Sequence, residues 1–421
     1  MKYIYLFLVI FTSITAQIKF DDYFIDKTLR IDILLTGDKN NVEVSLYDVL
    51  QEPYWGGSKT VLIDELVYGN YFFKVYDIKS GTVIYSRGFN HLFQEWQSTE
   101  EAKTTKRSFD ATITLPYPKD SIKVELQSRD RRNNFTTIFE YTVDPNDYMI
   151  KKQQREMYDT FSVHSSGASS HCLDIVLIPE GYTEDEMDLF KEDCDSLAKY
   201  LFEYSPFDEF IENINIWGVE APSEESGTDI PGQNIWKKTI INSNFWTFRS
   251  ERYLMTYDYF KARDLAANVP YDQIYIIVNT DKYGGGAIYN YYSLTAAHHP
   301  VTKQIFVHEF GHGLAGLADE YGNDPTYQDY YPKDVEPWEP NITTLVDFKS
   351  KWKDLVSSGT PIPTPSEEKY YGVIGAFEGA GYADNGVYRS TYNSIMRSFA
   401  SNEFNEVCKK VLRKVIGLYI K

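Results

Sequence analysis

Residues 308–321 of this 421-residue chain have the sequence HEFGHGLAGLADEY, which is the central segment of the second half of the chain. It contains two histidines, His308 and His312, four positions apart. On an α-helix such residues lie one turn above each other, so their imidazoles can bind one ion from the same side. Three apolar residues with the same spacing face roughly the opposite way: Phe306, Phe310 and Leu314. The sequence therefore predicts a helix with an apolar back and a metal-binding front.

The His-Glu-x-x-His spacing is typical of a catalytic zinc site. A catalytic zinc takes three protein ligands and keeps a fourth position for water, and bound zinc lowers the pKa of that water to about 7. Glu309 lies beside the first histidine, where it can accept the proton of the water and later pass it to the leaving amine. Because short motifs recur by chance, a surface or core helix that merely carries two histidines is the alternative.

The third ligand is expected from the residues after the helix, and no histidine occurs beyond His312. Gly316 predicts the end of the helix, because glycine tolerates the left-handed conformation of a C-terminal cap. Asp319 follows three residues later, which resembles the Gly-x-x step by which metzincin peptidases bring in their third ligand. The glycine comes one residue later than in that pattern, and an Asp stands where a His is usual. Asp319 is favoured and Glu320 is the alternative, although both can also be solvated acids past a helix end.

Three further features near this helix bear on the site. Met396 is the only methionine after the helix, and metzincins carry a methionine in a tight turn beneath the zinc ligands. An ordinary core methionine is the alternative. Residues 283–289 (YGGGAIY) predict either a glycine turn or an edge strand to which an extended peptide can add. The candidates for stabilising an oxyanion are Tyr388, Arg389 and Arg397.

The first half of the chain, residues 17–147, shows the pattern of β-strands. Apolar and polar residues alternate there, and turn-forming residues separate the short runs. No helical period is evident. One example of the alternation is the apolar set Leu29, Ile31 and Ile33, opposed by Arg30 and Asp32. This half is therefore predicted to be an all-β sandwich.

The second half, residues 165–421, has a different periodicity. Residues 174–178 and 274–278 are continuous apolar runs, which are typical of buried strands. A helix is predicted to begin at Thr183, with Glu186 in the capping-box position. Alternating strands and helices indicate a second domain of α/β or α+β type, with the domain boundary between residues 147 and 165.

The composition and the first residues indicate an exported protein. Residues 1–16 join a positive start to a short apolar run and small residues, which is the pattern of a secretory signal cleaved between Ala16 and Gln17. We therefore expect a periplasmic, cell-surface or extracellular location, with no transmembrane segment in the mature chain.

The formal net charge of −19 disfavours nucleic-acid binding. Three cysteines allow at most one disulfide and are expected to be buried small hydrophobes: Cys172, Cys194 and Cys408.

The chain resembles the IgA peptidase family of secreted bacterial metallopeptidases. The resemblance covers most of the chain from Leu173 to Ile416 and rests on the zinc motif quoted above. It is supported by residues 178–183 (IPEGYT), 224–231 (EESGTDIP) and 377–382 (FEGAGY). Residues 86–89 (SRGF) and 93–96 (FQEW) are similar to the β-sandwich domain that precedes the peptidase domain in some members.

The sequence thus predicts an N-terminal β-sandwich followed by a zincin or metzincin-like catalytic domain that acts as a secreted zinc endopeptidase. Zn²⁺ is expected on His308, His312 and Asp319, with Glu309 as the general base. Proteins or peptides are the expected substrates, host glycoproteins among them. The name of the family does not by itself identify the substrate of this chain. The alternatives are a non-catalytic zinc-containing surface protein that binds glycans or proteins, and a zinc hydrolase of non-peptide amides or esters.

Overall fold

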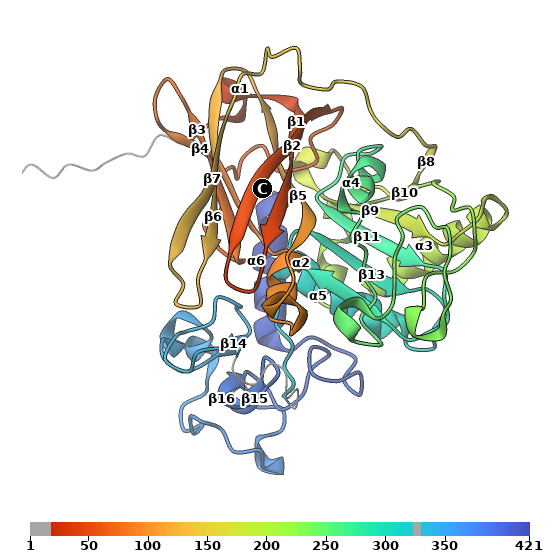
Figure 1. Ribbon diagram of the computed structural model, residues 1–421. Helices are drawn as coiled ribbons and strands as arrows, with labels where there is room; N and C mark the ends of the chain where they lie inside the picture. Colours follow the sequence, from red (N-terminus) through yellow and green to blue (C-terminus); the bar gives the residue numbers. More distant parts are fainter. Residues whose placement is uncertain (1–17, 323–329) are drawn as a thin grey trace, which may run out of the picture.

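The N-terminal half of the chain forms two antiparallel sheets (Figure 1). The computed structural model describes residues 18–322 and 330–421, so the predicted signal at residues 1–16 lies outside the described part. One sheet has the order β2-β1-β5 and the other β4-β3-β6-β7. The bounds of these strands are β1 (Phe24–Gly37), β2 (Val42–Glu52), β3 (Tyr71–Asp77), β4 (Val83–Phe89), β5 (Arg107–Pro118), β6 (Ile122–Arg129) and β7 (Phe135–Val143).

The alternation in the sequence corresponds to the two faces of β1. Leu29, Ile31 and Ile33 are fully buried in a core that both sheets share. The opposite face is buried as well, with Arg30 and Asp32 at most 1% exposed, because it packs against the second half of the chain. Two short helices interrupt this half, α1 (Phe20–Tyr23) and α2 (Leu92–Gln97). Helices of one or two turns are too short to show a helical period in the sequence.

The second half is built around a six-stranded sheet with the order β12-β13-β11-β9-β10-β8. The central strands are parallel, and both edge strands, β12 and β8, pair antiparallel to their neighbours. Strand β8 lies within the segment between the two predicted domains, so this unit begins by Thr160. The bounds are β8 (Thr160–His164), β9 (Leu173–Glu180), β10 (Ile214–Val219), β11 (Gln273–Val278), β12 (Gly285–Ile288) and β13 (Tyr292–Ala296).

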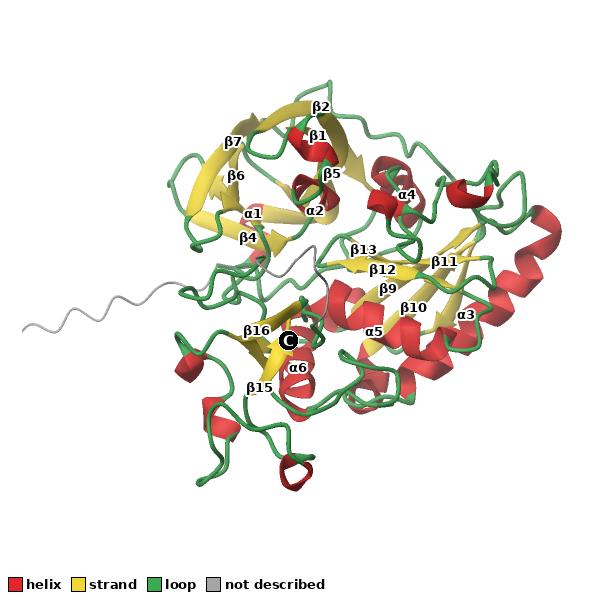
Figure 2. Ribbon diagram, turned by 60° about the horizontal axis from the view of Figure 1, so that its bottom comes forward, coloured by secondary structure: helices red, strands yellow, loops and turns green. Residues whose placement is uncertain are grey.

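Helices cover both faces of this sheet (Figure 2). One face packs on α3, α5 and α6 in a core of its own. The other face, together with α4, joins the core of the N-terminal sheets. Strand β9 is buried along its whole length, which explains its continuous apolar run. The helices are α3 (Met187–Phe202), α4 (Tyr259–Ala266), α5 (Thr302–Ala315) and α6 (Glu406–Tyr419), and a small third sheet contains β14 (Ile342–Thr343), β15 (Phe377–Ala380) and β16 (Ala383–Arg389).

Local sequence signals for helices are confirmed where they were strongest. Thr183 and Glu186 form the predicted capping box, one 3₁₀ turn ahead of α3.

Three cysteines are free and buried, and two of them, Cys194 and Cys408, pack within the core under the sheet. Within residues 18–322 and 330–421, no helix combines the length and the apolar character needed to cross a membrane.

A buried ionic network joins the two halves of the chain. Arg30 of β1 bonds Asp32 of the same strand at 2.6 Å and reaches Asp264 of α4 at 2.7 Å. Glu52 of β2 lies 3.4 Å from the same guanidinium. Burial raises the pKa of the Glu52 carboxyl, and the charge of Arg30 opposes this shift. The guanidinium therefore compensates carboxylates that would otherwise be buried without a partner.

Replacing Arg30 by Met is expected to destabilise the protein by about 3–5 kcal/mol, because it leaves buried carboxylates without a counter-charge. Chemical denaturation of the variant and the parent measures this difference. The matched control is Lys123→Met, which removes an exposed pair with Glu140 and is expected to cost less than about 1 kcal/mol. Equal small effects in the two variants would contradict the role given to Arg30.

Candidate metal centre

Helix α5 presents the two histidines as the sequence predicted. Its back is buried in the core, with Phe306 3%, Phe310 1% and Leu314 0% exposed. His308 and His312 project from the other side, and their imidazole centroids lie 4.7 Å apart. The apolar back thus fixes the rotation of the helix, and this rotation directs both imidazoles to one point.

Gly316 ends the helix and reverses the chain, which confirms the predicted cap. Its φ of 60° lies in the left-handed region, which glycine adopts without steric cost. The reversal brings the carbonyl of Leu317 to the Nδ1 atom of His312, so the residue that follows the cap also orients a ligand. Two residues beyond Leu317, Asp319 arrives in front of the helix.

Three side-chain atoms converge in front of α5. The Nε2 atoms of His308 and His312 lie 3.0 Å apart. The Oδ1 atom of Asp319 lies 3.2 Å from Nε2 of His308 and 3.5 Å from Nε2 of His312. These three residues form the one group of metal-ligating side chains found in the described part of the chain.

The hydrogen bonds around these atoms fit a cation. Nδ1 of His308 bonds the carbonyl of Ile395 at 3.0 Å, and Nδ1 of His312 bonds that of Leu317. A carbonyl oxygen only accepts, so each Nδ1 carries a proton, and in the neutral imidazole, which is the form that binds a metal, Nε2 presents a lone pair. Such backbone contacts are the usual way in which a protein orients metal-binding histidines. Oδ1 of Asp319 is directed at both Nε2 atoms, so all three atoms can act as ligands of one cation when the imidazoles are neutral.

Asp319 is held in place by its neighbours and stays ionised. Tyr382 donates a hydrogen bond of 2.6 Å to Oδ2, which leaves Oδ1 directed at the histidines. Burial raises the pKa of the Asp319 carboxyl, but attraction to His312 and His308 outweighs it and holds this pKa well below its usual range. The same attraction raises the pKa of His312 to about 9, against the opposite effect of burial.

Glu320, the alternative ligand, faces a different part of the protein. Its carboxylate is fully buried and accepts hydrogen bonds from Ser394 at 2.5 Å and from Asn405 at 3.0 Å. Asn341 also donates to it, at 3.1 Å. These bonds join the chain after α5 to the start of α6 and to the turn that contains Met396. The geometry therefore favours Asp319 for the metal and gives Glu320 a structural role.

Glu309 lies between the metal-binding face and the edge strand β12. A Cβ atom on Gly285 would approach Cγ of Glu309 to 3.3 Å, so glycine in this strand gives the carboxylate its space. Glu309 keeps part of its surface open, while desolvation raises the pKa of its carboxyl above the usual value, against the attraction of His308 and His312. A raised pKa suits a group that takes up and releases a proton. Of the two interpretations for residues 283–289, the edge strand is confirmed.

Met396 lies in a turn directly beneath α5. The N–H of Arg397 bonds the carbonyl of Ser394 at 3.0 Å, which closes the turn. Met396 is fully buried, and its Sδ would lie 3.2 Å from a Cβ on Gly311, between the two histidines. The adjacent carbonyl of Ile395 orients His308. The turn thus supports the site, as predicted from the sequence.

The three candidates for an oxyanion group serve other purposes. Arg389 is buried and donates to the carbonyls of Glu378 and Gly379, and Arg397 donates to that of Tyr392. Tyr388 lies in β16, paired with β14. The polar groups near Asp319 are instead Tyr382 and Tyr321, whose rings lie 5.5 Å apart. Tyr382 is the last residue of the FEGAGY segment, which supported the family resemblance. The sequence did not show that this tyrosine contacts Asp319.

The N-terminal half also contributes a carboxylate near the centre. Tyr253, which bridges to Gly285 of β12, donates a hydrogen bond of 2.5 Å to Glu95 of α2. Burial raises the pKa of Glu95 to about 7, and the bond from Tyr253 opposes this shift. Sequence reasoning missed Glu95, because nothing in a local pattern shows that α2 lies against the second half of the chain.

Comparison with known protein families agrees with this geometry. The candidate metal site lies on a helix beside the edge strand of a mixed sheet. The family model described as IgA Peptidase M64 matches residues 161–373 and 366–416, and the model described as Peptidase M64 N-terminus matches residues 19–140. The chain therefore belongs to the IgA peptidase M64 family and is a peptidase. A search of curated proteins found no match.

Asp319→Ala is expected to weaken zinc binding by more than about 100-fold, since loss of even an outer partner of a ligand costs about 10–100-fold. Glu320→Gln is expected to keep stoichiometric zinc but to lower the unfolding free energy by about 1–3 kcal/mol, through mismatched buried hydrogen bonds. Titration with zinc and chemical denaturation separate the two effects. Zinc retained by Asp319→Ala and lost from Glu320→Gln would make Glu320 the ligand.

Proposed function

We propose that this protein is a secreted zinc-dependent endopeptidase in which Glu309 is the general base. The observation that carries the proposal is the convergence of His308, His312 and Asp319 on one point. Two imidazole nitrogens and one carboxylate oxygen suit zinc, and three protein ligands are the number that leaves a position for water at a catalytic zinc. Membership of a peptidase family supports peptide bonds as the target.

The chain supplies the groups that peptide hydrolysis needs. Zinc held at this centre would make a water molecule acidic enough to lose a proton near neutral pH. The Glu309 carboxylate accepts that proton while the water oxygen bonds to the peptide carbonyl carbon. When the carbon–nitrogen bond breaks, Glu309 returns the proton to the leaving amine. Tyr382 and the carbonyls of Ile395 and Leu317 keep the three ligands oriented throughout.

We further propose that the chain consists of an N-terminal β-sandwich and a metzincin-like catalytic domain. The two N-terminal sheets bury a common core, which supports a β-sandwich. The glycine cap before Asp319 and the Met396 turn beneath the histidines support a metzincin-like arrangement. Under this proposal the N-terminal domain is not a separate module, since Glu95 of α2 bonds Tyr253 beside the edge strand.

Glu309→Gln is expected to bind zinc like the parent and to lower kcat/KM for peptides by about 10²- to 10⁴-fold, the usual contribution of a general base. Gln has nearly the same shape but takes up no proton, so the fold and the ligands stay in place. A diverse peptide library, with zinc content measured on both proteins, provides the test.

Chelation is the matched control for this prediction. Removal of zinc from the parent is expected to abolish cleavage, and added zinc is expected to restore it. If the parent binds zinc and cleaves no peptide, the peptidase mechanism fails for this chain. Binding of glycans or host proteins would then favour a non-catalytic surface protein, and hydrolysis of amide or ester substrates a different zinc hydrolase.

We also propose export through a cleaved signal at residues 1–16, which the charged start and short apolar run support. Expression of the full chain in a host with a secretory pathway is expected to give an exported protein that begins at Gln17. Mass spectrometry of the exported chain identifies its first residue. Retention of the intact chain inside the cell would refute the signal.

A further inference from the structure

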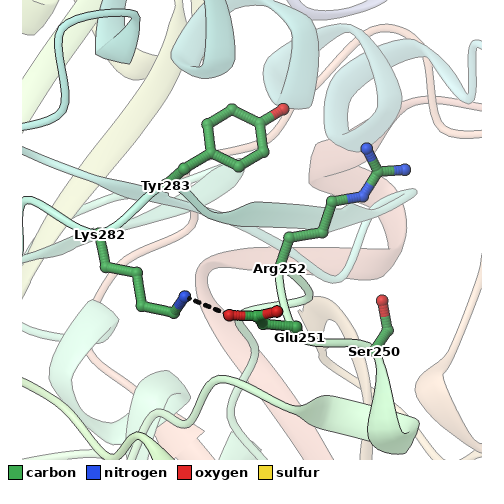
Figure 3. Close-up of a pocket in the computed structure, with 5 residues that line it drawn as sticks. All are labelled: Ser250, Glu251, Arg252, Lys282 and Tyr283. Atoms are coloured by element: carbon green, nitrogen blue, oxygen red, sulfur yellow. Dashed lines mark hydrogen bonds and ion pairs between the residues drawn. The ribbon is translucent and has the colours of Figure 1, made fainter.

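A pocket of about 440 Å³ opens beside the metal centre, lined by Ser250, Glu251, Arg252, Lys282 and Tyr283 (Figure 3). Four of these residues carry charged or phenolic side chains. The pocket is formed by the segment before Tyr253 and by the residues that lead into β12.

Two charges of the pocket neutralise each other, and one does not. Lys282 forms an ion pair of 3.0 Å with Glu251. Within the residues that the structure describes, the guanidinium of Arg252 makes no hydrogen bond or ion pair. Figure 3 shows this guanidinium and the hydroxyl of Tyr283 directed away from the Lys282–Glu251 pair. The lining therefore keeps a net positive charge, in a chain whose formal net charge is −19.

The pocket adjoins the reacting centre through β12. A Cβ on Gly284 would approach the carbonyl of Arg252 to 2.9 Å, and the next residue, Gly285, packs against Glu309. Burial lowers the pKa of Arg252, but attraction to neighbouring groups, with Tyr321, Tyr283 and Asp319 among them, raises it overall. Through Gly284 and Gly285, the segment of Arg252 therefore lies next to the strand that borders Glu309.

We propose that Arg252 is a specificity-determining residue that binds a carboxylate of the substrate next to the scissile bond. Its planar guanidinium matches a carboxylate with two parallel hydrogen bonds, and the hydroxyls of Tyr283 and Ser250 are further donors on the lining. The inference rests on the proposed peptidase function and specifies its substrates as peptides with an acidic group near the cleaved bond. For an endopeptidase, that group is the side chain of an Asp or Glu residue in the substrate.

The experiment uses matched peptides in which a single Glu, placed at each of the three positions on either side of the cleaved bond, is exchanged for Gln or for Lys. The zinc-loaded parent is expected to prefer Glu at one position by about tenfold or more in kcat/KM, the effect of one charged hydrogen bond. In Arg252→Gln that ratio is expected to fall to about one, and in Arg252→Glu to favour Lys over Glu. Amidated and free C-termini distinguish a side-chain carboxylate from a terminal one.

The control variant is Arg249→Gln, which removes an exposed arginine of the same segment that does not line the pocket. It is expected to keep the Glu preference of the parent. A parent without this preference, or a preference that survives in Arg252→Gln, overturns the role of Arg252.

Equilibrium binding of the same peptides to Glu309→Gln keeps this test separate from that of the proposed function. Tighter binding of the Glu peptide, lost when Arg252→Gln is added to Glu309→Gln, supports the pocket even if the parent cleaves nothing. Cleavage without any discrimination between Glu and Gln retains the peptidase and refutes the pocket.

Discussion

Three candidate ligand atoms converge in front of α5, and this convergence is possible only because the surrounding elements fix each side chain separately. The two Nε2 atoms lie 3.0 Å apart, and the Oδ1 atom of Asp319 lies 3.2 Å from that of His308. The apolar back of the helix prevents rotation of the histidines. The carbonyls of Ile395 and Leu317 prevent their imidazoles from turning over.

The elements that hold the site come from distant parts of the chain. Glu320 is the hydrogen-bond acceptor that joins them, since Ser394, Asn341 and Asn405 all donate to its buried carboxylate. Asp319 and Glu320 therefore differ in their surroundings. Oδ1 of Asp319 is directed at the two histidines, whereas the oxygens of Glu320 accept hydrogen bonds from protein donors and stabilise the turn beneath the helix.

The N-terminal half is tied to the second half by charge as well as by apolar packing. Arg30 links β1 to α4 across the interface, and the shared core continues from the two antiparallel sheets onto one face of the mixed sheet. Across the same interface, the hydroxyl of Tyr253 donates a hydrogen bond to the carboxylate of Glu95. An interface with buried ionic groups imposes a specific arrangement, because each charge needs its partner in place.

Local sequence patterns were sufficient to predict α5, its glycine cap and the placement of His308 and His312 on one face, since these depend on residues within one or two turns of each other. Alternation and apolar runs likewise located β1, β9 and β11, because burial of one or both faces follows the period of a strand. Asp319 and Glu320 are adjacent in the chain and chemically alike, and only their tertiary contacts show that Asp319 faces the histidines whereas Glu320 faces the start of α6. The tertiary structure also brought Tyr382, Glu95 and Arg252 to the centre. Each of these side chains is placed by the packing of an element that is distant in the sequence. Such packing produces no periodic pattern from which it could be predicted.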